Sequence, residues 1–160
     1  MAYRETNSLL RLFGTPRELL SKADGDLARL TKALAHGRQR DALHALMDCS
    51  ITVFHTGDWI RATHSDHSRS SSDLAANSKW LRMTRDIANA AKHGDLTWKP
   101  VDAEAHGAVL ATMEYKIDRR NPATGHRIVG FATDATSHDV LDVLREAIAE
   151  WRAFVEAQGI

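Results

Sequence analysis

The sequence lacks several features that mark common protein classes. Its single cysteine, Cys49, cannot form an internal disulfide, which fits a reducing, cytoplasmic setting. No stretch approaches the roughly 18 consecutive apolar residues of a membrane span, and the first residues lack the apolar core of a signal peptide. Gly-rich phosphate loops, dinucleotide fingerprints and paired-cysteine metal motifs are also missing. These absences favour a soluble intracellular protein and exclude the commonest nucleotide and zinc motifs.

The chain also has no excess of charge of either sign. Lys plus Arg and Asp plus Glu number 21 each, so no overall field attracts nucleic acid or an anionic membrane. Binding to phosphates would therefore need a local patch, and Arg119-Arg120 with His126-Arg127 forms one compact positive cluster. With 160 residues, of which 43% are hydrophobic, the chain is expected to form one domain over residues 1–160.

Apolar residues at helical spacing predict a mainly helical protein. Thr15, Pro16 and Glu18 favour a helix start, and Asp24-Gly25-Asp26 is expected to interrupt that helix before a second apolar run ends at His36-Gly37. The serine-rich stretch 63–73 favours a polar surface loop. The two strongest central helices are expected at 39–62 and at 73–93, the second capped by Ser72 or Asp73 and ended by Gly94.

Beyond residue 100 the apolar period changes from that of a helix to that of a strand. Residues 109–118 alternate, and turn residues separate them from a second apolar stretch at 126–133, so a β-hairpin is expected over about 108–133. A capping pair, Thr136 and Asp139, then introduces a C-terminal helix at about 137–157. A lone hairpin is marginally stable, so it must pack on the helices or on another chain. The predicted fold is a bundle of four or five helices with one β-hairpin.

Two helices carry polar stripes. Arg82, Asp86, Asn89 and His93 lie four, three and four residues apart, which places them on one helix face. His44, Asp48, His55 and Asp58 form a similar row on the preceding helix, beside its apolar face. The two rows could meet at the seam between the helices, and the sequence leaves open whether they face each other. A polar seam is costly unless it is satisfied, which makes it a candidate site, although solvated helix faces often look the same.

The segment LRMTRDIANAAKHGDL resembles the signature segment of HEPN-type helical-bundle proteins. In that superfamily an arginine with a polar follower precedes a histidine by four to six residues near a helix end. The resemblance assigns these roles to Arg85, Asp86 and His93, with seven residues between arginine and histidine, one more than the pattern has. Taking Asn89 as the polar follower restores its spacing to His93 but puts Ala88 where arginine should be.

The resemblance implies a homodimeric, metal-independent RNase of toxin or defence type, with no cofactor, although other members of the superfamily are not catalytic. His93 would act as general acid or base, and Arg85 would hold the phosphate. Asp86 and Asn89 would orient these two groups, and Lys92 would add attraction for phosphate. The supporting residues would be His55, Asp58 and Arg82. No small-molecule ligand is specified by the sequence.

Two alternatives remain open. His55 and Asp58 with Asp86 and His93 could surround a divalent metal ion, although helical di-iron sites draw on glutamates that neither central helix contains. The other alternative is a non-catalytic accessory or interaction protein whose polar seam specifies packing. In that case Trp59, Trp80 and Trp151 serve as core or seam residues, and Cys49 is a buried small hydrophobe.

Overall fold

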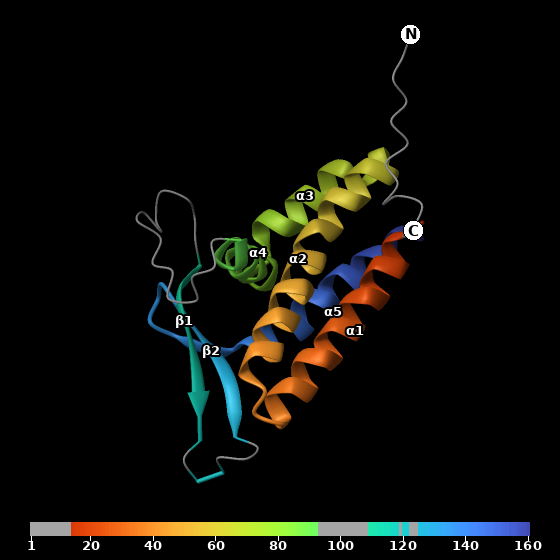
Figure 1. Cartoon of the computed structure of the whole chain (residues 1–160). Coiled ribbons are helices and arrows are strands. Elements are labelled where there is room, and N and C mark those ends of the chain that lie inside the picture. The colour runs from red at the N-terminus through yellow and green to blue at the C-terminus, as the bar shows by residue number, and fades with distance from the viewer. Residues whose placement is uncertain (1–13, 93–108, 119, 122–124) are drawn as a thin grey trace.

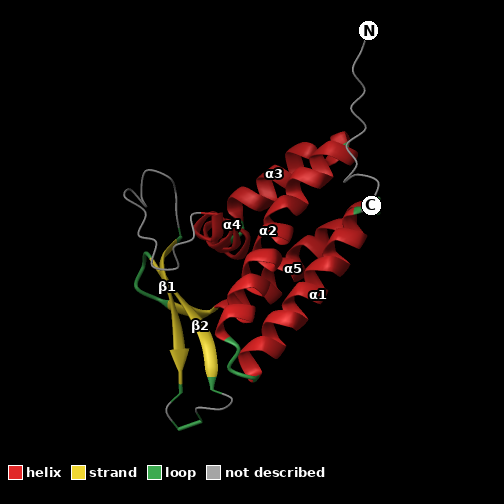
Figure 2. Cartoon of the chain, in the orientation of Figure 1, coloured by secondary structure: helices red, strands yellow, loops and turns green. Residues whose placement is uncertain are grey.

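The computed structural model describes residues 14–92, 109–118, 120–121 and 125–160. Within these residues the chain forms five α-helices, a short 3₁₀ helix and a three-stranded antiparallel sheet that precedes the last helix (Figure 1). Figure 2 shows the helices and the sheet as separate regions, with the strands to one side of the bundle. The predicted mainly helical class is confirmed. None of the described helices has the length and apolar character needed to cross a membrane.

Two long antiparallel helices, α1 (Pro16–Ala35) and α2 (Gln39–Thr63), form the largest part of the bundle. The predicted start of α1 is confirmed, because the Thr15 hydroxyl accepts from the Glu18 backbone and the Glu18 carboxylate accepts from the Thr15 backbone. The expected interruption at Asp24-Gly25-Asp26 is wrong. Asp26 is buried in an unbroken helix, and its carboxylate is held by Lys22, Arg29 and Thr52.

The serine-rich segment is more ordered than its composition suggests. Instead of a loop, it forms a 3₁₀ turn, η2 (Ser65–His67), and a helix, α3 (Ser68–Asn77). Three serine hydroxyls of α3 donate to carbonyls one turn earlier, so the serines are compatible with the helix. The next helix, α4 (Lys79–Lys92), therefore starts after Ser78 and not at Asp73. The Ser78 hydroxyl accepts from the Leu81 backbone and donates to Glu150, which fixes this start.

The predicted hairpin is confirmed and is joined by one further strand. Strand β1 (Leu110–Ile117) pairs with β2 (His126–Ala132) in the register Tyr115 to Ile128, and β2 pairs with β3 (Ser137–Asp139). The expected capping pair of the last helix is wrong, because Thr136 binds Asp134 in the turn before β3. Helix α5 (Val140–Gln158) is capped instead by the Asp139 carboxylate, and Gly159 ends it in a left-handed conformation, as predicted.

The core lies where α5 packs between α1, α2 and α4. Its largest side chain is Trp151, which is buried and donates from Nε1 to the carbonyl oxygen of Val53, 3.1 Å away. Gly57 allows this approach, since a Cβ there would lie 3.1 Å from the Trp151 ring. The predicted role of Trp151 as a core residue is confirmed, and α5 is thereby locked onto α2 beside the candidate site.

Candidate functional site

The candidate site is a pocket of about 90 Å³ between α2, α3, α4 and α5. Its charged residues are Asp58 and Arg61 from α2 and Arg85 from α4, and Trp151 with Phe54 contributes apolar lining. The two central helices thus bring together Asp58, a member of the predicted row on α2, and Arg85, the arginine of the HEPN-like segment, which lies beside the row on α4. Because α4 crosses α2 steeply, the contact is confined to the second half of α2 (Figure 1).

Asp86 is the most constrained polar residue of the site. It is 4% exposed, and its Oδ2 accepts hydrogen bonds from the backbone nitrogens of Val109 at 2.6 Å and Leu110 at 3.1 Å. Its Oδ1 accepts from Nε and Nη2 of Arg85 at 3.1 and 2.9 Å. A buried carboxylate with four donors is satisfied. Asp86 therefore ties the start of β1 to α4, which is a structural role that the sequence did not indicate.

Arg85 is positioned by that carboxylate. Two of its N–H groups bind one Asp86 oxygen, and its side chain is 32% exposed where it lines the pocket. Such a pair fixes the plane of the guanidinium, so the group meets a ligand with little loss of side-chain entropy. Of the other predicted residues on α4, Arg82 and Asn89 are half-buried. Lys92 is the last residue of α4, and His93 lies outside the described residues.

On the α2 side of the pocket, the Asp58 carboxylate contacts both His55 and Arg61. The Nδ1 atom of His55 lies 2.6 Å from Asp58 Oδ2, and Arg61 binds Asp58 Oδ1. With neutral imidazole, Nδ1–H is the donor to Asp58, which leaves Nε2 as the acceptor nitrogen. The His55 side chain is 43% exposed, so Nε2 belongs to a solvent-reachable ring. An imidazole oriented by a carboxylate in this way suits proton transfer.

Arg61 is the residue that the sequence interpretation missed. It stands three residues after Asp58, a helical spacing that brings its guanidinium back onto the Asp58 carboxylate, and its Nη1 lies 3.4 Å from the Ser72 hydroxyl of α3. The spacing was visible in the sequence, but the pocket exists only because α3 is a helix. The pocket lining consequently carries two guanidinium groups, each paired with a carboxylate, Arg61 with Asp58 and Arg85 with Asp86, so any preference for an anionic ligand comes from the N–H donors and not from net charge.

The first half of the α2 row does not reach the site, so the two rows do not meet along their length. His44 is exposed and lies near the start of α2, where it lines a different pocket. Asp48 accepts a hydrogen bond from Arg29 of α1 at 2.7 Å, and the bonds that Arg29 donates to Asp48 and Asp26 raise its pKa above the ordinary value. Because α2 is 25 residues long, its row has different neighbours along its length: Asp48 contacts α1 and Asp58 lines the pocket.

Two other kinds of site, a metal centre and a reactive Cys49, find no support among the residues that the structure describes. Among the described residues no three His, Cys, Asp or Glu side chains gather as a metal site, and the Asp86 oxygens already serve Arg85 and β1. Cys49 is fully buried, and burial raises the pKa of its thiol to about 12, so no thiolate forms near neutral pH. Its predicted role as a small buried hydrophobe is confirmed.

Comparison with known proteins identifies no relative: no family model, curated protein or solved structure matches the chain. The site is therefore interpreted from its own residues.

Proposed function

We propose that this protein is a HEPN-like, metal-independent endoribonuclease that uses Arg85 to hold the scissile phosphate. The observation that carries the proposal is the pocket itself, in which a guanidinium fixed by the buried Asp86 lies with Arg61 and Asp58. Two guanidinium groups in one recess suit the non-bridging oxygens of a phosphodiester, whose negative charge grows in the transition state. Asp86 acts as a positioning residue and does not touch the substrate.

The reaction needs one group that accepts a proton and one that donates a proton. The base removes the proton from the ribose 2′-hydroxyl, the 2′-oxygen forms a bond to phosphorus, and the bond from phosphorus to the 5′-oxygen breaks. The departing 5′-oxygen then receives a proton, and the products are a 2′,3′-cyclic phosphate and a 5′-hydroxyl. We assign His93 to one of these roles, and His55, held by the pocket residue Asp58, is the candidate for the other. A homodimer would join two such sites in one cleft.

The test is cleavage of a labelled single-stranded RNA in the presence of EDTA. We expect His93→Ala to lose at least 100-fold in rate, within the range that general acid or base catalysis contributes. Arg85→Lys keeps the charge but loses the fork, and we expect roughly tenfold slower cleavage. The matched controls are His67→Ala and Arg145→Lys, which change the same residue types on exposed or half-buried positions outside the pocket. Wild-type rates in both site variants would refute the proposal.

One observation favours a second candidate, the non-catalytic accessory protein. Asp86 is saturated by Arg85 and by two strand amides, as expected for a polar seam that specifies packing. If the folded wild-type chain leaves RNA intact and Asp86→Asn lowers only stability, the accessory protein takes the place of the enzyme. The two candidates therefore differ in one measured quantity, the cleavage rate of the wild-type chain.

A further inference from the structure

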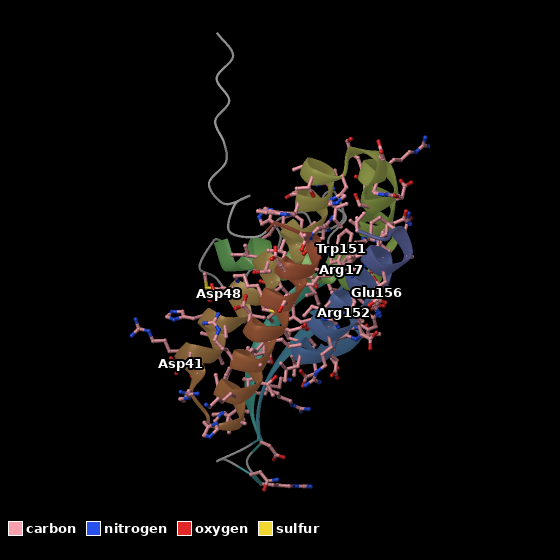
Figure 3. All side chains as sticks on the ribbon, turned by 90° about the vertical axis from the view of Figure 1, so that its right-hand side faces the viewer. Arg17, Asp41, Asp48, Trp151, Arg152 and Glu156 are labelled. Carbon is pink, nitrogen blue, oxygen red and sulfur yellow. The ribbon has the colours of Figure 1, made fainter. Side chains whose placement is uncertain are left out.

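One end of the helical bundle carries more cationic than acidic side chains, although the whole chain is neutral and Asp26 and Asp48 pair with Arg29 there. Residues 27–47, which include the turn from α1 to α2, contain four Lys or Arg residues and one acidic residue, Asp41. We call this region, together with the adjoining end of the β1–β2 hairpin, the basic end. Its cationic residues in the described chain are Arg29, Lys32, Arg38, Arg40, Arg120 and Arg127. Nitrogen-tipped side chains gather around Asp41 in Figure 3.

The fold joins two segments that are far apart in the sequence. Gly37, in the turn between α1 and α2, has φ +64°, and a Cβ on it would lie 2.7 Å from Nε2 of His126. The first residue of β2 thus rests against the α1–α2 turn, and Figure 1 shows both at the same end of the molecule. The positive cluster that the sequence indicates around His126-Arg127 is therefore only half of the basic end.

A recess of about 250 Å³ lies within the basic end between α1 and α2. Its charged lining comes from Arg29 and Lys32 of α1 and from Arg38, Asp41 and His44 beside or within α2. Arg29 is anchored by its two carboxylate partners, and Arg38 lies 3.4 Å from Asp41. In contrast, Lys32 and Arg40 form no ion pair with any residue that the structure describes. Their charges are therefore not offset by a neighbouring carboxylate.

The start of α2 adds a second source of positive potential. Its N-cap residue is Arg38, whose side chain makes no capping hydrogen bond to the first turn. The first backbone N–H groups of a helix have no partner within the helix, and the helix dipole places partial positive charge there. In α2 the Gln39 N–H is already bonded to the Gly37 carbonyl and Asp41 lies in the first turn, so the terminus adds to the potential of the neighbouring cations and is not a phosphate site by itself.

We propose that the basic end binds the phosphate backbone of a nucleic acid, at a site separate from the Arg85 pocket. The occupant is inferred from charge complementarity: Lys32 in the recess and Arg40 beside it are exposed cations with no ion-pair partner among the described residues, an arrangement that suits the phosphates of a nucleic-acid backbone. Binding of this kind depends on charge and not on base sequence. It requires no cleavage, so it stands whether the Arg85 pocket is catalytic or not.

The experiment measures binding of a labelled, uncleavable 2′-O-methyl RNA of 20 nucleotides by fluorescence anisotropy at several salt concentrations. The test variant is Lys32→Gln with Arg40→Gln, two exposed changes that break no ion pair among the described residues. The control is Arg17→Gln with Arg69→Gln, which removes the same charge from α1 and α3 at the opposite end of the bundle. Circular dichroism checks that both variants are folded.

We expect the test variant to bind at least tenfold more weakly and to lower the slope of log K against log salt by about 1.4, because each lost contact removes about 0.7 for a single strand. The control should keep the wild-type slope. Equal loss in both variants, no loss in either, or no wild-type binding at 50 mM salt would overturn the proposal, as would a preference for vesicles of anionic lipid over RNA. If the wild-type protein cleaves RNA but the variant Lys32→Gln with Arg40→Gln binds RNA as tightly as the wild type, this inference is overturned and the proposed function is not.

Discussion

Replacing Asp86 is the most direct test of the hydrogen bonds that tie β1 to α4. Asp86→Ala removes a charged acceptor from two backbone N–H groups, and that of Leu110 is buried. Hydrogen bonds to a charged group contribute roughly 1.5–3 kcal/mol each, so the two amides alone account for about 3–6 kcal/mol of lost stability. The pair with Arg85 adds little, because that side chain is one-third exposed and water screens the interaction.

Two further variants separate the contribution of the two strand amides from that of Arg85. Asp86→Asn keeps one acceptor oxygen but directs its NH₂ group either at the guanidinium of Arg85 or at the strand amides, so we expect a loss of about 2 kcal/mol. Arg85→Ala leaves both strand amides bonded to Asp86, and we expect about 1 kcal/mol. The order of destabilisation is then Asp86→Ala, Asp86→Asn, Arg85→Ala.

The assay is urea unfolding followed by circular dichroism, with thermal melts as a second measure. For a domain of this size 1 kcal/mol corresponds to roughly 2–4 °C, so Asp86→Ala should lower the melting temperature by about 6–24 °C. The slope of the urea transition should stay constant, which shows that the folded state is the one affected. A loss in Asp86→Ala no larger than that in Arg85→Ala would refute the reasoning, because the strand amides would then contribute nothing.

Two further predictions concern the core. Burial raises the pKa of Cys49 to about 12 from an ordinary 9.0, so the folded state holds the thiol proton more tightly than the unfolded state does. Between pH 9 and 12 the free energy of unfolding of the wild type should therefore fall by up to about 1.4 kcal/mol per pH unit relative to Cys49→Ala, as measured by urea titration. An equal pH dependence of the two proteins would contradict this. Gly57→Ala should not stabilise α2, because its Cβ would press on the Trp151 ring, whereas Gly25→Ala meets no atom within 4 Å and should gain about 0.5–1 kcal/mol. A gain at Gly57 matching that at Gly25, in the same melts, would show that Trp151 can move.

Local signals in the sequence predicted the elements whose ends are fixed by their own residues. The Thr15–Glu18 capping box and Gly159 are such signals, and both ends were predicted correctly. The errors occurred where tertiary contacts outweigh local preference. Asp26 is buried against α2, where Thr52 binds it, and Lys22 and Arg29 one turn away in α1 satisfy its charge, so the helix continues through a sequence that normally ends one. Likewise, α3 forms although its serines favour a loop, and it packs on α2 and α4.

The candidate site was predictable only in part, and the reason is physical. Helical period identifies which residues share a face, so it placed Asp86 in the row on α4 and His55 and Asp58 in the row on α2, whereas Arg85 was singled out by the HEPN-like segment. It does not identify what that face meets, because the pocket lies at the second half of α2, and His44 and Asp48 contact other parts of the fold. The role of Asp86 was harder still to predict. Its main partners are backbone N–H groups at the start of β1, and backbone groups carry no residue signature in a sequence.

This partner set also limits how Arg85 can act on a phosphate. Its Nε and Nη2 atoms meet a single Asp86 oxygen, so a phosphate must approach the guanidinium from another direction, and the pocket shared with Arg61 defines it. The position of Arg85 thus depends on Asp86, and Asp86 depends on β1. If Arg85 holds the scissile phosphate, any change that loosens β1 from α4 should slow cleavage more than it weakens binding at the basic end, because that surface is built by α1, α2 and the far end of the hairpin. Asp86→Asn, measured below its melting temperature, combines both readouts in one protein.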